Sequence, residues 1–441
     1  DIFYINLLFF SYLIYNLLLV YYILIFLDHI DQSIYPIHVN VLVQHFLTQD
    51  KSRLPCISLL TDGESNHKPP RGEVAMFQRY IDANPEIKNC IFNTYGFGYN
   101  LDSKLLFNLS NELNGMYSFI PDAGMVGTIF INSISNILTT IGNSCQISIE
   151  FNNDIKIKKI YGLHKNYNIT TWGMIIDVGS LQIGQNKTFI VDFIGEANQI
   201  EKNIDINLNL KYIFDKEIIN KNSVNFSYNL DDILIQEYCR LKLCDFLIPI
   251  CLNGKIKGLK SYFDKFINEL NNINCHEDLL TDVTGQINMG LLDNNHFTKW
   301  GKHFIPSLLK AHLLQQCLNF KDPGVQKYGG KLFNSIRDKA DEAFNKLPPP
   351  KPKNNFATST APVRSMATYN NQYGGCFDGL GKVLLPDNKL IKVKNLKKGD
   401  KVLSLFNKVA EVVCIIRTRI KNSIYLVDIH GVKLTPWHPI F

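Results

Sequence analysis

The sequence lacks the cysteine patterns that would assign it to a disulfide-rich or zinc-binding class. Its ten cysteines include no CxxC pair and no zinc spacing, and the nearest group is Cys239, Cys244 and Cys251 in apolar helical sequence. We interpret the cysteines as buried thiols of a reducing compartment rather than as disulfides or metal ligands. This interpretation favours a cytoplasmic location.

The sequence also lacks a strong excess of charge of one sign. It has 46 basic and 40 acidic residues, a formal net charge of +6, and no basic stripe interleaved with aromatic residues. We therefore expect no nucleic-acid partner. The 441 residues, 46% of them hydrophobic, suit about three domains at roughly 150 residues each.

An uncharged run covers residues 3–27. Its length fits a membrane span, which needs about 20 apolar residues, but it lacks the basic start and cleavage site of a signal peptide. Three interpretations stay open: a membrane anchor, a buried pair of strands, or a translated intron. We favour the last, a gene-model artefact in a fragment that begins at Asp1, and set residues 1–39 apart as a separate segment.

The remaining chain predicts a multidomain α/β, β and α protein. Residues 40–142 alternate short apolar runs with amphipathic stretches, which is typical of a partial, doubly wound parallel sheet. Residues 143–346 form a second region: apolar and polar residues alternate over 145–230, as in an antiparallel β-sandwich, and helical spacing follows over 232–346. Residues 347–373 are rich in Pro, Asn, Ser and Thr and predict a flexible linker, after which residues 374–441 stand as their own all-β module.

The residue types at the two ends of this last module suit cleavage of the chain's own backbone. Gly374 and Gly375 precede Cys376, whose thiol can attack the carbonyl before it. Near the other end, the motif Thr435-x-x-His438 supplies an imidazole that can protonate the departing amide nitrogen and a hydroxyl that can fix the geometry. The catalytic candidates are therefore Cys376, Thr435 and His438, with cleavage between Gly375 and Cys376.

The module resembles the Hint domain of Hedgehog proteins and inteins. The matching text is GCFDGLGKVLLPDNKLIKVKNLKKGDKVLS at the start and LTPWHPI at the end. The resemblance implies a thioester intermediate that water, an alcohol or a downstream side chain resolves. Hint domains continue for several strands past the histidine, so we expect a truncated module. The sequence has no terminal His-Asn pair, so completed splicing is not expected. Asp400, in a Gly-Asp turn signal, is expected to be structural.

The upstream part resembles other modules of the same architecture. Residues 54–140, with PCISLLTDGESN, resemble the second half of a von Willebrand factor A domain, and residues 145–346 resemble the intervening domain, most specifically over FTKWGKHFIPSLLKAHLLQQCLNFKDPGVQKYGGKLF. Complete A domains hold Mg²⁺ through an Asp-x-Ser-x-Ser loop that this chain lacks. We therefore expect no cofactor, with Asp62 as a residual metal candidate, and an unknown protein ligand as the partner of this region.

One further metal site was considered in the helical region. His303 and His312 are nine residues apart and Cys317 follows five residues later. Helical core positions and caps account for all three more simply than a metal does.

Two functions follow from these patterns. The first is an autoprocessing protein whose Hint module acts on its own backbone and releases or modifies the upstream part. The alternative is a protein-binding scaffold that carries an inactive Hint remnant. A membrane location stays open through residues 3–27.

Overall fold

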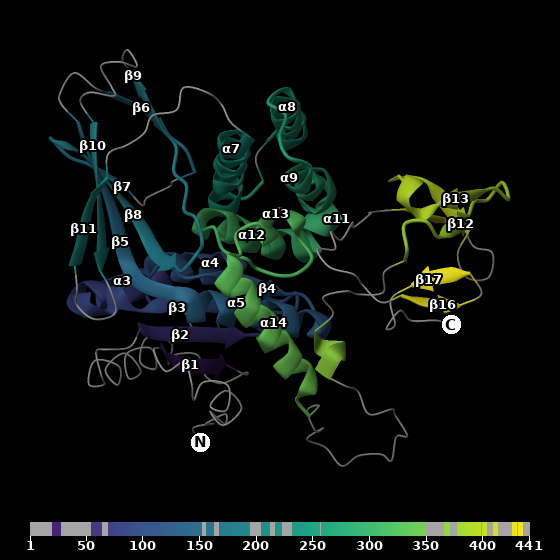
Figure 1. Ribbon diagram of the computed structural model, residues 1–441, viewed down its shortest axis with the longest axis horizontal. Coiled ribbons are helices and arrows are strands. Elements are labelled where there is room, and N and C mark those ends of the chain that lie inside the picture. Colours follow the sequence, from purple (N-terminus) through teal and green to yellow (C-terminus); the bar gives the residue numbers. More distant parts are fainter. Residues whose placement is uncertain are drawn as a thin grey trace.

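The computed structural model describes residues 20–27, 54–63, 69–151, 156–162, 167–194, 204–211, 217–222, 232–255, 257–348, 366–370, 377–397, 399–403, 409–412, 426–429 and 431–434. An α/β layer, an antiparallel β region and a group of helices make up the main body, and the C-terminal strands lie apart from it in Figure 1. Within the described ranges, no helix has both the length and the apolar character needed to cross a membrane.

The α/β layer is built on a four-stranded parallel sheet in the order β1-β2-β3-β4, as the alternating pattern predicted. Buried apolar runs of this kind are typical of parallel strands covered on both faces. The strands are β1 (Val20–Leu27), β2 (Leu54–Thr61), β3 (Ile91–Phe97) and β4 (Tyr117–Ile120), and the helices of the layer are α3 (Glu73–Ala83), η2 (Pro85–Asn89), α4 (Ser103–Glu112), η3 (Ala123–Met125) and α5 (Val126–Thr139).

The N-terminal segment contributes to this sheet. Strand β1 pairs in parallel with β2, with Val20 opposite Leu54 and Leu27 opposite Thr61. Separating residues 1–39 from the α/β region was therefore wrong for residues 20–27. The run VYYILIFL is rich in β-branched and aromatic residues, which favour strands. Residues 3–19, the rest of the uncharged run, lie outside the described residues.

The boundary predicted from the sequence between residues 142 and 143 falls inside a strand. Helix α5 ends at Thr139, and strand β5 begins at the next residue, Thr140. The hydroxyls of these two threonines donate to the carbonyls of Ser135 and Asn136, so the last turn of the helix has partners without a glycine cap. With no turn residue between helix and strand, the sequence carried no signal for this junction.

The antiparallel region contains two sheets, as predicted for residues 145–230. A five-stranded sheet has the order β11-β10-β5-β8-β7, and a two-stranded sheet joins β6 and β9. The two sheets share a small core. The large sheet contributes Ile149, Met174 and Ile176, and the small sheet contributes Ile157, Ile160 and Val191. The strands are β5 (Thr140–Phe151), β6 (Lys156–Ile160), β7 (Tyr167–Ile169), β8 (Gly173–Gln182), β9 (Val191–Ile194), β10 (Ile204–Lys211) and β11 (Glu217–Asn222).

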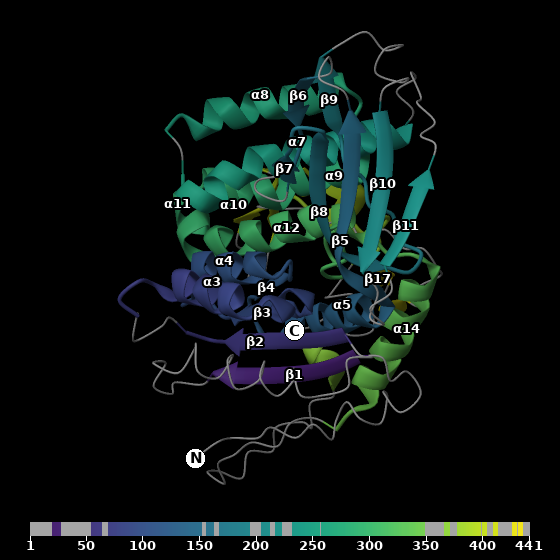
Figure 2. The ribbon, with the colours of Figure 1, turned by 90° about the vertical axis from the view of Figure 1, so that its left-hand side faces the viewer.

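The helical region follows, as its spacing predicted. Its core is continuous with that of the α/β layer, since one cluster runs from Ile57 in β2 to Phe333 in α14. The helices are α7 (Asp232–Asn253), α8 (Leu259–Asn272), α9 (Glu277–Asp282), η4 (Val283–Ile287), α10 (Asn288–Leu292), α11 (Asn294–His296), η5 (Phe297–Gly301), α12 (Lys302–Leu314), α13 (Pro323–Gln326) and α14 (Lys331–Lys346), of which η4 and η5 are π-helical turns. Figure 2 shows α7, α8, α10 and α12 stacked over the α/β layer, with α14 beside it.

The C-terminal residues form short two-stranded ribbons. They are β12 (Lys382–Leu384) with β13 (Leu390–Lys392), β14 (Lys401–Leu403) with β15 (Val409–Glu411), and β16 (Val427–Ile429) with β17 (Val432–Leu434), with the 3-10 turn η7 (Val393–Asn395) between them. The predicted linker at 347–373 is partly ordered, since Met366–Tyr369 form the 3-10 turn η6 and Asn370 is buried. The prediction of an entirely flexible linker was therefore wrong for residues 366–370.

Helix α12 is held at its C-terminal end by two basic side chains, the buried Arg240 and the partly buried Lys187. Arg240 of α7 donates from Nη1 to the carbonyl of His312 at 2.9 Å and from Nη2 to the carbonyl of Thr188 at 2.7 Å. Lys187 donates to the carbonyl of Leu314. Positive charge at a helix C-terminus is favourable, and these donors satisfy carbonyls that the helix itself leaves without partners. The β region, α7 and α12 are thereby joined at one point.

Replacing Arg240 with methionine should lower the free energy of unfolding by about 3 kcal/mol, because the carbonyls and Glu237 lose a buried charged donor. Urea unfolding at neutral pH measures the change. Lys242→Met on the same helix is the control: its ion pair with Glu269 is partly exposed, and an exposed pair contributes at most about 1 kcal/mol. Equal losses in the two variants would contradict the role given to Arg240.

Candidate functional site

The four residues of the predicted cleavage site, Gly375, Cys376, Thr435 and His438, lie outside the described residues. A described residue adjoins two of the four, Cys376 and Thr435. Phe377 follows Cys376, and Leu434 precedes Thr435. The structure therefore describes Phe377 and Leu434, which flank two of the site residues.

Phe377 and Leu434 form an antiparallel bridge. The amide of Asp378 donates to the carbonyl of Lys433 at 2.9 Å, which extends the pairing by one residue. The Leu434 side chain is 5% exposed, whereas that of Phe377 is 51% exposed. The first and last described residues of the C-terminal segment are thus joined backbone to backbone.

A tight hairpin presents Leu434 to this bridge. In the β16–β17 ribbon, Val427 pairs with Leu434 and Ile429 with Val432. The Asp428 carboxylate accepts from the amide of Gly431 at 2.8 Å, and Gly431 has a φ of +86°. A positive φ favours glycine, so the local sequence Asp-x-x-Gly determines this turn and with it the position of Leu434.

Asp400 closes a second turn. Its carboxylate accepts from the amide of Lys397 at 2.7 Å, and its own amide donates to the Lys397 carbonyl at 3.1 Å. Gly399, with a φ of +91°, lets the chain reverse, and Val412 bonds to both Gly399 and Asp400 from the neighbouring strand. These bonds give Asp400 the structural role predicted for it.

The C-terminal segment has little closed core in its described part. Leu434 is the one fully buried hydrophobic residue among the described residues after 376. Two-stranded ribbons are marginally stable alone, so apolar surface left open here is available for further contacts. The exposed large apolar side chains are Phe377, Leu380, Leu384, Leu390, Val409 and Val432.

Asp62 does not have the surroundings of a magnesium ligand. It is exposed at the C-terminal end of β2, where the loop hydrogen bond is made by Thr61 and Gly63. The described residues contain no group of three His, Cys, Asp or Glu side chains that could share a metal ion. Because Mg²⁺ needs several oxygen ligands in near-octahedral order, the described residues around Asp62 do not fit one.

His303 and His312 are core residues of α12, and each has a protein partner. The Nδ1 atom of His303 lies 2.5 Å from Ser103 Oγ, to which Tyr117 also donates at 2.6 Å. The Nδ1 atom of His312 lies 2.7 Å from the hydroxyl of Tyr328. Both rings are fully buried, so these polar pairs join helices to the sheet and to one another, as the core interpretation predicted.

Most of the described cysteines of the body are buried free thiols. None of the eight described cysteines forms a disulfide, and seven of them are buried. Burial raises the pKa of the Cys90 thiol to about 12, as it does for Cys145 and Cys244. A thiol with such a pKa carries no appreciable thiolate at neutral pH, so these residues are poor nucleophiles.

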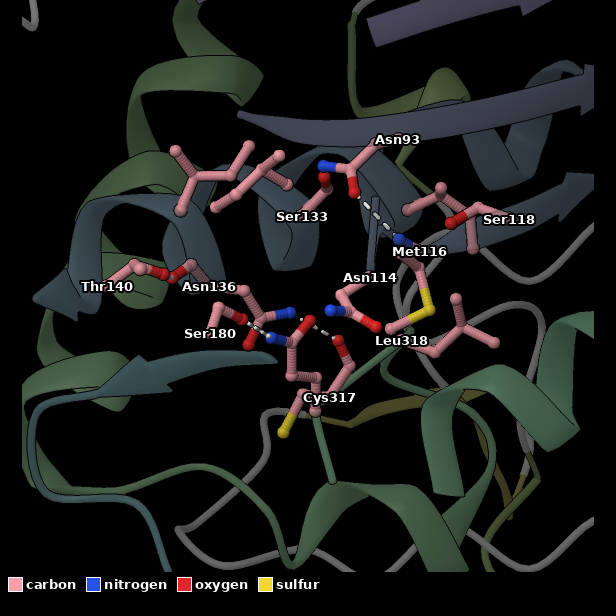
Figure 3. A pocket seen from close by; sticks show the side chains of 14 residues that line it. Asn93, Asn114, Met116, Ser118, Ser133, Asn136, Thr140, Ser180, Cys317 and Leu318 are labelled. Atoms are coloured by element: carbon pink, nitrogen blue, oxygen red, sulfur yellow. Dashed lines mark hydrogen bonds between the residues drawn. The ribbon is translucent and has the colours of Figure 1, made fainter. Parts of the chain in front are cut away.

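A small polar cavity lies where β3, β4, α5, β8 and the segment after α12 meet (Figure 3). Its volume is about 20 Å³, enough for one water molecule. Asn136 donates to the carbonyl of Cys317 at 2.8 Å, while its Oδ1 atom and the Ser118 hydroxyl are buried there without a protein partner among the described residues. Its size and polar lining suit a structural water rather than a ligand.

Comparison with known families identifies the C-terminal segment. Residues 375–441 match the Hint-domain family. The chain ends in a Hint segment. Residues 272–342, upstream of it, match the family described as VWA / Hh protein intein-like. The Phe377–Leu434 bridge lies within these matched residues. No curated protein matches the chain significantly.

Two solved structures are similar to the chain at low identity. The ArnB paralog VWA2 from Sulfolobus acidocaldarius is 12% identical over 62% of this chain and 67% of its own, with a TM-score of 0.34. A von Willebrand factor type A protein from Catenulispora acidiphila is 13% identical over 58% of this chain and 65% of its own, with a TM-score of 0.33.

The pKa of His303 gives the body a measurable pH dependence. Burial, assisted by the charge of Lys302, lowers this pKa to about 4 against an ordinary value of 6.5. Between these values the unfolded chain takes up a proton that the folded chain does not. The free energy of unfolding therefore decreases as the pH falls from about 6.5 to about 4, by up to roughly 3 kcal/mol at 1.4 kcal/mol per pKa unit.

We expect His303→Gln to reduce the fall in melting temperature between pH 7 and pH 4.5, because glutamine cannot titrate. Calorimetry at several pH values measures the slope. His276→Gln, which changes an exposed histidine of the same region, is the comparison variant. Parallel slopes for all three proteins would show that His303 does not carry the effect.

Proposed function

We propose that the protein processes itself: the Hint segment cleaves the chain between Gly375 and Cys376 and releases or modifies the upstream body. The observation that carries the proposal is the antiparallel bridge between Phe377 and Leu434, within a segment that matches the Hint-domain family over residues 375–441. The bridge connects the residue after the nucleophile candidate to the residue before the Thr-x-x-His motif.

Covalent geometry supports a common site for these groups. Paired residues in antiparallel strands have Cα atoms about 4.5–5.5 Å apart, and adjacent residues in a chain have Cα atoms about 3.8 Å apart. Starting from the bridge, the Cα atoms of Cys376 and Thr435 can be separated by at most about 13 Å. His438 follows Thr435 by three residues, a short distance along the chain.

The proposed first step is an acyl shift from nitrogen to sulfur. The Cys376 thiolate attacks the carbonyl carbon of Gly375, a C–S bond forms, and the C–N bond to Cys376 breaks. The departing nitrogen takes a proton from the His438 imidazolium and leaves as the neutral α-amine of Cys376. Thr435 hydrogen-bonds the same carbonyl or the imidazole ring and so orients it.

The thioester is then opened by a nucleophile. Water attacks the Gly375 carbonyl, the C–S bond breaks, and the products are a carboxylate on Gly375 and a free thiol on Cys376. An alcohol or a thiol in place of water would leave an ester or a new thioester on the upstream body. In this proposal the substrate of the reaction is the chain's own backbone, and no metal or redox cofactor takes part.

A second candidate function is a protein-binding scaffold with an inactive Hint remnant. It is favoured by the open apolar surface of the Hint segment, where Leu434 is the one fully buried hydrophobic residue in the described part. In that case the upstream body, whose sequence resembles von Willebrand A domains, would recruit a protein ligand, and residues 375–441 would not act on the chain.

Incubation of the purified full chain with a thiol such as dithiothreitol separates the two functions. Autoprocessing predicts two fragments, divided between Gly375 and Cys376, that gel electrophoresis resolves and mass spectrometry identifies. Cys376→Ala should abolish cleavage, and His438→Ala should slow it by about 100-fold, a typical contribution of general acid catalysis.

Cys414→Ala is the matched control, since this cysteine belongs to the same segment but to an apolar run. It should cleave at the wild-type rate. An uncut wild-type chain in the presence of thiol, with the body folded by calorimetry, would remove autoprocessing and leave the scaffold function.

A further inference from the structure

The chain is fastened to the body shortly before the proposed cleavage site. Residues Met366–Asn370, here called the docked turn, contact α14, η3 and α5. In Figure 1 the docked turn is the yellow-green segment beside α14. Asn370 is 5% exposed, as buried as a core residue. The turn is thus part of the folded body, although it lies within sequence typical of a linker.

A fitted socket receives Asn370. Gly127, in the first turn of α5, leaves the space that the asparagine occupies: a Cβ atom on Gly127 would lie 2.4 Å from Asn370 Cβ and 2.8 Å from its Cα. Asn370 Nδ2 donates to Asp341 Oδ1 and, at 3.4 Å, to Asn345 Oδ1. Asn345 also donates to Asp341 at 3.2 Å, so the acceptor is oriented by its own helix.

The length of the chain after the socket is short. Phe377 is the first described residue of the Hint segment, and it follows Asn370 by seven residues. At no more than about 3.6 Å per residue, the two positions lie within about 25 Å of each other. An anchor at Asn370 therefore restricts the volume that the Gly375–Cys376 bond can occupy relative to the body.

We propose that Asn370 and its socket are a positioning device for self-cleavage, an inference that rests on the function proposed above. The socket holds the upstream side of the scissile bond, and the Phe377–Leu434 bridge holds the downstream side. Fixing both sides reduces the conformational freedom lost on reaching the reactive geometry. Cleavage is therefore faster when the body is folded with the turn docked than when the turn is loose. Asn370 acts through the chain and touches no reacting atom.

Gly127→Ala in the full chain tests this directly. Alanine suits a helix but fills the socket, so the docked turn should be displaced while the body stays folded. We expect thiol-induced cleavage to slow by roughly three- to tenfold. Gly285→Ala is the matched control, a helical glycine with no atom within 4 Å of the added Cβ, and it should cleave at the wild-type rate.

A conservative pair at the acceptor gives a second measurement. Asp341→Asn keeps an oxygen acceptor for the Asn370 amide and should retain nearly the wild-type rate, whereas Asp341→Leu removes the acceptor and should slow cleavage as Gly127→Ala does. If Asp341 only stabilised the body, the cleavage rate of each variant would instead fall in step with its melting temperature, which calorimetry measures.

Hydrogen exchange of residues 366–370 in a Cys376→Ala background measures docking without any cleavage. Gly127→Ala should raise the exchange rate there. The inference is overturned if exchange does not change, or if exchange rises while the cleavage rate of Gly127→Ala equals or exceeds that of the wild type; in both cases self-cleavage itself stands. A wild-type chain that stays uncut despite a protected turn would instead remove the proposed function, and the positioning role with it.

Discussion

Burial of helix α12 is the constraint on which the body depends. This helix contacts α4 and β4 of the α/β layer and α7 of the helical region, and its polar residues bond to both. Ser307 accepts from the amide of Phe119 at 3.1 Å, His303 pairs with Ser103, and Arg240 binds the C-terminal end. Because a buried polar group without a partner destabilises a fold, these bonds require the layers to assemble together. The α/β layer and the helical region are therefore one unit with a continuous core.

Local patterns in the sequence predicted most elements of this body, because periodicity and caps are properties of neighbouring residues. Asp102, a residue type preferred at helix N-termini, caps α4 by accepting from the amide of Leu105 at 2.9 Å. The boundaries between regions were predicted poorly. Helix α5 passes into β5 without a turn residue. The uncharged run over residues 3–27 has the length of a membrane span, whereas its last part, β1, has the character of a strand. Only pairing with β2, a contact between distant residues, distinguishes these possibilities.

For the site, the sequence indicated the catalytic candidates but not the contacts around them. Cys376, Thr435 and His438 could be selected because the chemistry restricts which residue types can serve, and the match over residues 375–441 supports the same segment. The bridge between Phe377 and Leu434 could not be foreseen, since neither residue carries chemistry of its own. Asn370 could not be foreseen either: asparagine is abundant in this sequence, so one more in a polar linker gives no signal.

Anchoring on both sides of the proposed cleavage site would relate the body to the proposed chemistry. A flexible linker would let the Hint segment act independently of what precedes it, and the upstream protein would be cargo. A turn docked on α5 and α14 makes the state of those helices part of the geometry of cleavage. Helix α14 packs along α5, and α5 packs on β4, so the socket exists only after the sheet and its helices have assembled. Self-cleavage would then follow folding of the body, and a chain with an unfolded body would be cleaved more slowly.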